Sequence, residues 1–290
     1  MINTLTGREV LLRYFLPDTV AEATAGLAEK NYRIVAGGTD FYPALADQPV
    51  RDDVMDISGL QALRGIARET KHTRIGALAT WTDIARAELP NKFRGLQLAA
   101  REVGALQIQN VATVAGNLCN ASPAADGVPP LLTLNAQVEI SAANGQRVLP
   151  LDQFILGNRR TALEPNEMLT AILIPNDAEA ANSHFMKLGS RQYLVISYVM
   201  VATLLEADDS GIITQARVSV GACSEVACRL ADLEAALVGQ PLTTTSAVVR
   251  PDHLSILAPI DDIRASADYR LAAALEYTRR SLSACTEGLL

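Results

Sequence analysis

One stretch, residues 107 to 127, limits the possible fold more than any other part of the chain. It reads Gln-Ile-Gln-Asn-Val-Ala-Thr-Val-Ala-Gly-Asn-Leu-Cys-Asn-Ala-Ser-Pro-Ala-Ala-Asp-Gly. Small and amide residues dominate it, and it shows neither the period of an amphipathic helix nor the alternation of a half-buried strand. Short side chains leave the backbone open to close approach. The sequence therefore predicts a loop that a bound molecule reaches.

A second candidate loop, Ala36-Gly37-Gly38-Thr39-Asp40, lies between a predicted strand and a predicted helical turn. Its two glycines permit positive φ and close backbone contact, and free N–H groups before a helix suit a phosphate. Within the first stretch, Thr113 to Asn117 adds a hydroxyl, a glycine backbone and an amide. We predict that the two loops meet and clamp a dinucleotide. The alternative is that both are simple tight turns.

Two familiar nucleotide motifs are absent from the sequence. It contains no G-x-G-x-x-G on a strand-helix-strand unit and no G-x-x-x-x-G-K-[ST]. A phosphate site in this chain therefore needs a different scaffold from the Rossmann fold or the P-loop.

The order of predicted elements indicates two domains, which also agrees with a length of 290 residues. Helices and strands alternate before Pro175, and Pro175 to Glu179 has the composition of a linker, so we place a boundary near 176. Beyond it, Asp208-Asp209-Ser210-Gly211 predicts a hairpin between two strands. The predicted helices are 20–30, 96–103, 229–238 and 269–282, with helical turns from 41 and 80, and the predicted strands are 33–36, 53–58, 73–78, 137–141, 168–174, 198–207 and 212–220.

Charge and composition argue against several classes of partner and site. A net charge of −7 with no basic run disfavours nucleic acid and anionic membranes, and no apolar stretch is long enough to span a bilayer. No secretory signal is readable at the N-terminus, so we expect a cytoplasmic protein. The four cysteines and three histidines are scattered, which predicts no metal site and no catalytic triad in this chain.

Five segments, in this order, carry a resemblance to a known family. They are Ala36 to Asp40, Gln107 to Asn117, Ala121 to Asp126, Lys187-x-x-x-Arg191, and Ser266 to Arg270. Together they resemble the FAD-binding medium subunits of xanthine dehydrogenase, carbon monoxide dehydrogenase and related molybdenum hydroxylases. The resemblance extends over essentially the whole chain.

The resemblance implies an α+β fold. It consists of a p-cresol-methylhydroxylase-type FAD-binding domain of two α/β subdomains, followed by a C-terminal domain of antiparallel sheet and helices. On this sequence the FAD-binding domain is residues 1–176, with subdomains of about 1–58 and 59–176, and the C-terminal domain is 177–290.

The resemblance also implies a set of cofactor-binding residues but no catalytic or metal-binding ones. The two glycine loops would wrap the FAD pyrophosphate, with Asn120, Ser122 and Asp126 toward the ribityl chain and flavin. A backbone contact at Leu169 would meet the adenine, and Lys187 would lie near the isoalloxazine. The alternatives are a solvated Lys187 and an Asp126 that caps the helix after it. The full set is Val35, Ala36, Gly37, Gly38, Thr39, Asp40, Thr113, Val114, Ala115, Gly116, Asn117, Asn120, Ser122, Asp126, Leu169 and Lys187.

The function implied by the resemblance is electron transfer in a larger complex. A large partner would hold the molybdenum cofactor, a small partner two 2Fe–2S clusters, and FAD on this chain would pass electrons to NAD+, oxygen or another acceptor. Three departures from the family matter: Ala115 replaces a frequent glycine, Gln109 replaces a frequent basic residue, and residues 194–196 replace an acidic one. The acceptor therefore does not follow from the resemblance. The alternatives are a self-sufficient FAD-dependent oxidase and a flavin-free scaffold.

Overall fold

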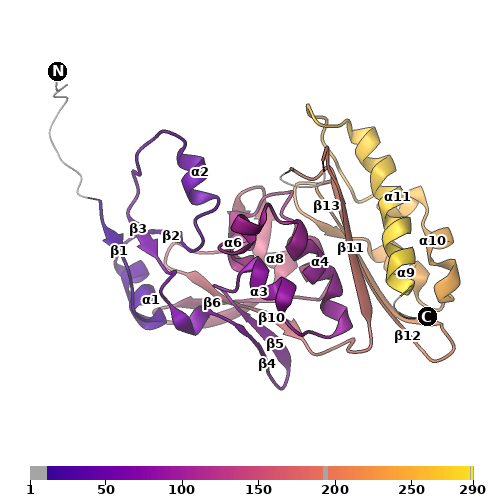
Figure 1. Ribbon diagram of the computed structural model, residues 1–290, viewed down its shortest axis with the longest axis horizontal. Coiled ribbons are helices and arrows are strands. Elements are labelled where there is room, and N and C mark those ends of the chain that lie inside the picture. Colours follow the sequence, from indigo (N-terminus) through magenta and orange to yellow (C-terminus); the bar gives the residue numbers. More distant parts are fainter. Residues whose placement is uncertain (1–11, 192–194, 288, 290) are drawn as a thin grey trace.

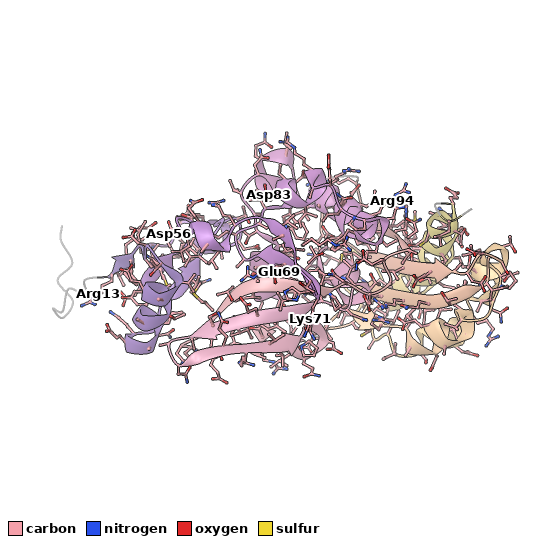
Figure 2. All side chains as sticks on the ribbon, turned by 90° about the horizontal axis from the view of Figure 1, so that it is seen from below. Arg13, Asp56, Glu69, Lys71, Asp83 and Arg94 are labelled. Atoms are coloured by element: carbon pink, nitrogen blue, oxygen red, sulfur yellow. The ribbon has the colours of Figure 1, made fainter. Side chains whose placement is uncertain are left out.

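Three parts follow one another along the long axis of the molecule (Figure 1). The structure is a computed structural model, which describes residues 12–191, 195–287 and 289. In the view from below, Asp56 lies in the first part, while Asp83 and Arg94 lie on helices of the second (Figure 2). No helix in the described part of the chain is long and apolar enough to cross a membrane.

The first part is a small parallel sheet packed with one helix. Its strands are β1 (Tyr14–Phe15), β3 (Val54–Asp56) and β2 (Arg33–Val35), in that spatial order. Helix α1 (Val20–Glu29) begins where the Thr19 hydroxyl accepts a hydrogen bond from the Glu22 N–H at 3.1 Å, and it buries Ala23 and Leu27. The short helix α2 (Phe41–Leu45) follows β2 and has no buried residue.

A five-stranded antiparallel sheet forms the second part. Strand β10 (Met168–Pro175) is its centre, because seven consecutive residues of this apolar strand are buried. The remaining strands, in the order β4-β5-β10-β6-β7, are β4 (Ile66–Arg68), β5 (His72–Gly76), β6 (Gln137–Ala142) and β7 (Gly145–Pro150). A separate hairpin joins β8 (Ile155–Gly157) to β9 (Arg160–Thr161). The helices are η1 (Gln61–Leu63), α3 (Trp81–Arg86), η2 (Asn91–Phe93), α4 (Arg94–Glu102), α5 (Leu106–Gln109), α6 (Val114–Asn120), α7 (Val128–Thr133) and α8 (Leu151–Phe154).

The third part is a four-stranded antiparallel sheet with helices on one side. Its strands are β11 (Asn182–Leu188), β12 (Val199–Ala207), β13 (Ile213–Gly221) and β14 (Cys228–Arg229). The hairpin predicted from Asp208 to Gly211 joins β12 to β13, with Gly211 at a φ of 74°. Helices α9 (Ala231–Leu237), α10 (Thr245–Val248) and α11 (Ala267–Thr286) lie beyond this sheet in Figure 1, together with η3 (Leu242–Thr244) and η4 (Pro251–Leu254). The predicted α+β fold is confirmed.

Two large hydrophobic cores, with a smaller cluster of Ala99, Phe185, Met200 and Ala202, underlie this arrangement in the described part of the chain. One extends from Ala23 to Ala181 and includes Leu204, and the other is built from residues between Val199 and Cys285. Helices α4 and α7 of the second part pack against strands of the third part. The cores therefore meet through packed elements as well as through the segment from Pro175 to Glu179, which we call the connecting segment.

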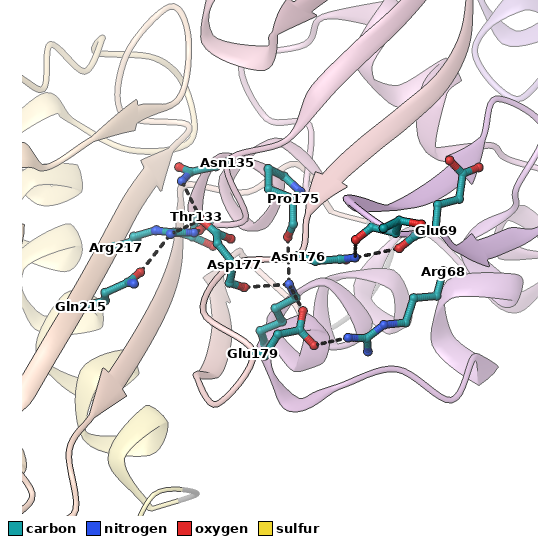
Figure 3. Close-up of polar contacts among 12 residues, drawn as sticks. Arg68, Glu69, Thr133, Asn135, Pro175, Asn176, Asp177, Glu179, Gln215 and Arg217 are labelled. Carbon is teal, nitrogen blue, oxygen red and sulfur yellow. Dashed lines mark hydrogen bonds and ion pairs between the residues drawn. The ribbon is translucent and has the colours of Figure 1, made fainter.

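A buried lysine of the second part fixes the connecting segment. Pro175, Asp177 and Glu179 of this segment are labelled in Figure 3. Lys92 is 1% exposed, and its ammonium donates to Pro175 O at 2.9 Å, Asp177 O at 2.8 Å and Glu179 Oε1 at 2.7 Å. Burial alone would raise the pKa of Glu179, but Lys92 and Arg68 outweigh it and hold that pKa below its ordinary value. An ammonium has three donors, so each one here has an acceptor.

The same segment is bonded from both sides. Arg217 of β13 donates to Asp177 Oδ2 at 2.6 Å and to Thr133 O at 3.2 Å. From the opposite side, Asn176 donates to Glu69 O at 2.8 Å, and Arg68 pairs with Glu179 at 2.7 Å. These bonds hold the connection between the two cores in one conformation.

We predict that Lys92→Met destabilises the protein by about 3 kcal/mol, because it removes the buried donor and leaves its acceptors unpaired. The midpoint of urea unfolding measures the loss. Lys71→Met, at an exposed lysine of the second part, is the matched control and should change the midpoint little. Equal midpoints for the two variants would show that the buried ammonium contributes nothing.

Candidate functional site

The loop after β2 touches the segment before α6 at Gly37. A Cβ built on this residue would lie 2.0 Å from the carbonyl oxygen of Val111 and 3.1 Å from Cα of Ala112. Only glycine fits there, and the reason is this backbone contact, since positive φ occurs at Gly38 (φ 70°) and not at Gly37. The structure thus brings the two predicted loops together.

The prediction of a loop at Thr113 to Asn117 is wrong, because these residues start helix α6. Thr113 is extended, and its hydroxyl accepts from the Gly116 N–H at 3.0 Å, which is an N-cap bond. Val114 and Leu118 give the helix a buried face that the surrounding small residues had hidden in the sequence. Ala115 has helical backbone, so replacing a glycine there costs no strain.

A cavity of about 490 Å³ lies where these segments meet, a volume typical of ligand sites. The loop after β2 and the start of α2 line it, as do α6 and the start of β10. Apolar side chains such as Ile34, Ile57 and Met168 alternate with backbone and amide groups on its walls. The predicted site residues that line it are Val35, Ala36, Gly37, Gly38, Thr39, Asp40, Thr113, Ala115, Gly116, Asn117, Asn120 and Leu169.

Several hydrogen-bond donors in the cavity wall have no acceptor in the described part of the chain. They include the backbone N–H groups from Gly37 to Asp40. At the start of α6, the N–H of Val114 donates to Ala79 O, and the N–H of Gly116 donates to the Thr113 hydroxyl. The N–H of Ala115, between them, has no acceptor among the described residues. The Asn117 side chain accepts from the Gly127 N–H at 3.3 Å, and its own amide group has no acceptor. Two sets of converging N–H donors suit an anion such as a diphosphate.

Four predicted site residues lie outside the cavity lining: Val114, Ser122, Asp126 and Lys187. Val114 is fully buried in the first core. Ser122 accepts a hydrogen bond from the Ala124 N–H at 3.2 Å, within its own turn.

Asp126 and Lys187 form an ion pair of 2.9 Å between the second and third parts. Lys187, on β11, also donates to Glu102 O at 2.7 Å, and Ser197 donates to the other carboxylate oxygen of Asp126 at 3.1 Å. The side chain of Lys187 is 6% exposed and that of Asp126 is 12% exposed, so Lys187 is not a solvated surface residue. Burial raises the pKa of Asp126, against the opposing effects of Lys187 and Ser197. The helix after Asp126 has Gly127 at its N-cap, so Asp126 is not a capping residue.

Comparison with known families identifies the family of the chain. The family described as "FAD binding domain in molybdopterin dehydrogenase" matches residues 9–177. The chain belongs to this family. Residues 184–285 match a second family, "CO dehydrogenase flavoprotein C-terminal domain", so the two matches together cover both cores of this FAD-binding subunit.

Relatives extend along almost the whole chain. It is 35% identical over 240 residues to the nicotinate dehydrogenase FAD-subunit of Eubacterium barkeri, covering 79% of this chain and 80% of the relative. It is 30% identical to the xanthine dehydrogenase FAD-binding subunit of Escherichia coli O157:H7, covering 93% and 94%.

Solved structures agree in fold. The carbon monoxide dehydrogenase of Hydrogenophaga pseudoflava matches with a TM-score of 0.84 at 26% identity, covering 94% of this chain and 96% of the solved one. Quinoline 2-oxidoreductase of Pseudomonas putida 86 matches with a TM-score of 0.86 at 26% identity, covering 96% and 97%. The chain is an FAD-binding oxidoreductase subunit.

Sequence reasoning overlooked some residues of the cavity. Arg159, Leu163 and Met168 line it from the β8–β9 hairpin and β10. The Gly-Asn-Arg-Arg turn was the available signal for Arg159. Leu194, one of the residues that depart from the family pattern, lies outside the described residues. No cluster of three or more His, Cys, Asp or Glu that could hold a metal occurs in ranges 12–191 and 195–287.

We predict that Gly37→Ala lowers the affinity for FAD by about tenfold or more, because the added methyl drives the two cavity walls apart. Bound flavin per chain, measured by absorbance after gel filtration, reports the loss. Gly59→Ala is the control, since nothing lies within 4 Å of a Cβ built there. Full flavin content in a folded Gly37→Ala protein would show that the contact with Val111 does not shape the site.

Proposed function

We propose that this chain is the electron-relay subunit of a molybdenum hydroxylase complex and does not itself transform the organic substrate. The observation that carries the proposal is the cavity with two converging sets of unpaired N–H donors, from Gly37 to Asp40 and at Ala115. Such a cradle suits the diphosphate of a dinucleotide. The family to which the chain belongs indicates that this dinucleotide is FAD.

The residues of the cavity fit FAD as follows. The Gly37–Asp40 loop and the first turn of α6 hold the diphosphate, and the free amide group of Asn117 adds a donor. The apolar wall at Met168 and Leu169 receives the adenine, with Asn120 on the ribityl side. Bound FAD supplies a redox centre that exchanges one or two electrons. This chain's residues hold it and exclude water from it.

In this proposal Asp126 and Lys187 lie near the flavin end of the cavity. They act by holding the parts of the chain around it, since neither lines the cavity. The ion pair ties the loop after α6 to strand β11, so it fixes the second part against the third beside the cavity. A buried cation near the flavin also favours negative charge on the reduced ring. The division of the chain near residue 176, with subdomains on either side of about residue 58, remains part of the proposal.

The complex around this chain is proposed from its relatives. Those named as medium chains or subunits include the carbon monoxide dehydrogenase medium chain of Hydrogenophaga pseudoflava, 27% identical over 93% of this chain and 96% of the relative. We propose a large partner with the molybdenum cofactor and a small partner with 2Fe–2S clusters, working in the cytoplasm. Electrons reach FAD from the clusters and leave to NAD+, oxygen or another acceptor.

We predict one noncovalently bound FAD per chain, since the cavity donors act by hydrogen bonding. Acid precipitation should release the flavin completely into the supernatant, where chromatography identifies it as FAD. A yellow pellet would contradict noncovalent binding. FMN in the supernatant would contradict the diphosphate cradle.

We also predict that the isolated chain accepts electrons poorly from organic molecules, whereas the assembled complex is reduced by its substrate. The experiment follows flavin bleaching under anaerobic conditions with purines, aldehydes and N-heterocycles, first with the chain alone and then with co-expressed partners. Dithionite, which reduces flavin directly, is the control for a reducible site. Rapid bleaching of the chain alone by one substrate would favour the self-sufficient oxidase instead.

A further inference from the structure

Arg159 carries a positive charge on the rim of the cavity, and none of the ion pairs among the described residues includes it. It lines the cavity, and one of its guanidinium nitrogens donates to the side-chain oxygen of Asn120. In the described part of the chain it forms no ion pair; Glu225, beside the same hairpin, accepts instead from the Asn158 N–H at 3.2 Å. The other arginine of the lining, Arg33, is paired with Asp52 at 3.4 Å.

The backbone of Arg159 is strained. Its φ is 58°, in the left-handed region where a hairpin turn ordinarily uses glycine or asparagine. The Arg159 N–H donates to Ala121 O at 2.9 Å, and Ala121 is itself left-handed, with a φ of 46°. Two strained residues thus hold the hairpin tip against the C-terminal end of α6. Unusual backbone of this kind is concentrated at functional sites.

The length of α6 separates Arg159 from the proposed diphosphate donors. The helix has 7 residues, which is about 10 Å along its axis at 1.5 Å per residue. The free N–H of Ala115 is at its start, whereas Asn120, which holds Arg159, is at its end. Arg159 is therefore held beside the C-terminal end of α6, about 7.5 Å along the helix axis from the N–H of Ala115.

We infer that Arg159 binds the flavin end of the cofactor, by donating hydrogen bonds to the carbonyl edge of the isoalloxazine. This inference rests on the proposed function, because it assumes that FAD occupies the cavity with its diphosphate at the start of α6. A guanidinium has a planar set of donors that matches such carbonyl oxygens. Its charge also stabilises the negative charge that reduction places on the ring. Arg159 is a binding residue that sets how easily the flavin is reduced.

The test compares two adjacent arginines of the same hairpin. Arg159→Gln removes the proposed contact, while Arg160→Gln removes an equal charge at an arginine that bonds to Leu156 O at 3.0 Å and lies outside the cavity lining. Fluorescence titration of the flavin-stripped full-length chain gives the affinity for FAD, and competition gives the affinity for ADP, which has the diphosphate but no flavin. We expect Arg159→Gln to weaken FAD binding about tenfold and to leave ADP binding unchanged. Arg160→Gln should leave both unchanged.

A second measurement is independent of binding strength. At saturating FAD, the midpoint reduction potential of the flavin should be lower in Arg159→Gln than in the wild type, with Arg159→Lys between the two and Arg160→Gln at the wild-type value. An equal loss of FAD and ADP binding would overturn the inference by placing Arg159 at the diphosphate. An unchanged potential together with unchanged FAD affinity would overturn it by removing any contact. A wild-type chain that binds ADP but not FAD would instead contradict the proposed function.

Discussion

The ammonium of Lys92 is the interaction on which the arrangement of the two cores depends. A charge that is 1% exposed is tolerated only where every donor is bonded, and here all three acceptors belong to the segment from Pro175 to Glu179. This segment begins at the last residue of β10, the central strand of the five-stranded sheet, and leads to β11. Because Arg217 holds Asp177 from the other side, the position of the third part is defined relative to the second. The ion pair of Asp126 and Lys187 is a further contact between the same two parts.

The site itself depends on the close contact at Gly37. It brings the loop after β2 against the segment before α6, so that N–H groups far apart in the chain converge on one cavity. Thr113 contributes by capping α6, which uses the Gly116 N–H and leaves that of Ala115 for a ligand. Backbone groups thus supply the donors of the proposed diphosphate cradle, while the side chains of Asn120 and Arg159 line the same cavity at the other end of α6.

Local signals in the sequence were sufficient for the central strands of the three larger sheets and for the longest helices. The Asp208 to Gly211 turn predicted its hairpin, and the apolar run from 168 predicted a strand, because turn chemistry and burial act over a few residues. The pair of glycine loops predicted much of the cavity lining for the same reason. Helix α6 was missed, since small residues mask its buried face. Lys92 bonds to residues 83 to 87 positions later, and Lys187 bonds to Asp126. These bonds follow from tertiary packing and leave no local pattern in the sequence.

The position of the Lys92 acceptors has a consequence for biosynthesis. A ribosome makes Lys92 long before it makes Asp177 and Glu179, so the nascent first core carries an ammonium without its acceptors while those residues are still absent. The charge can be buried with all its donors bonded only after Asp177 and Glu179 have been made. A fragment ending at residue 176 would stay in this unfinished condition, lacking two of the three oxygens. Complete hydrogen bonding of the Lys92 ammonium therefore depends on residues that are synthesised after the first core.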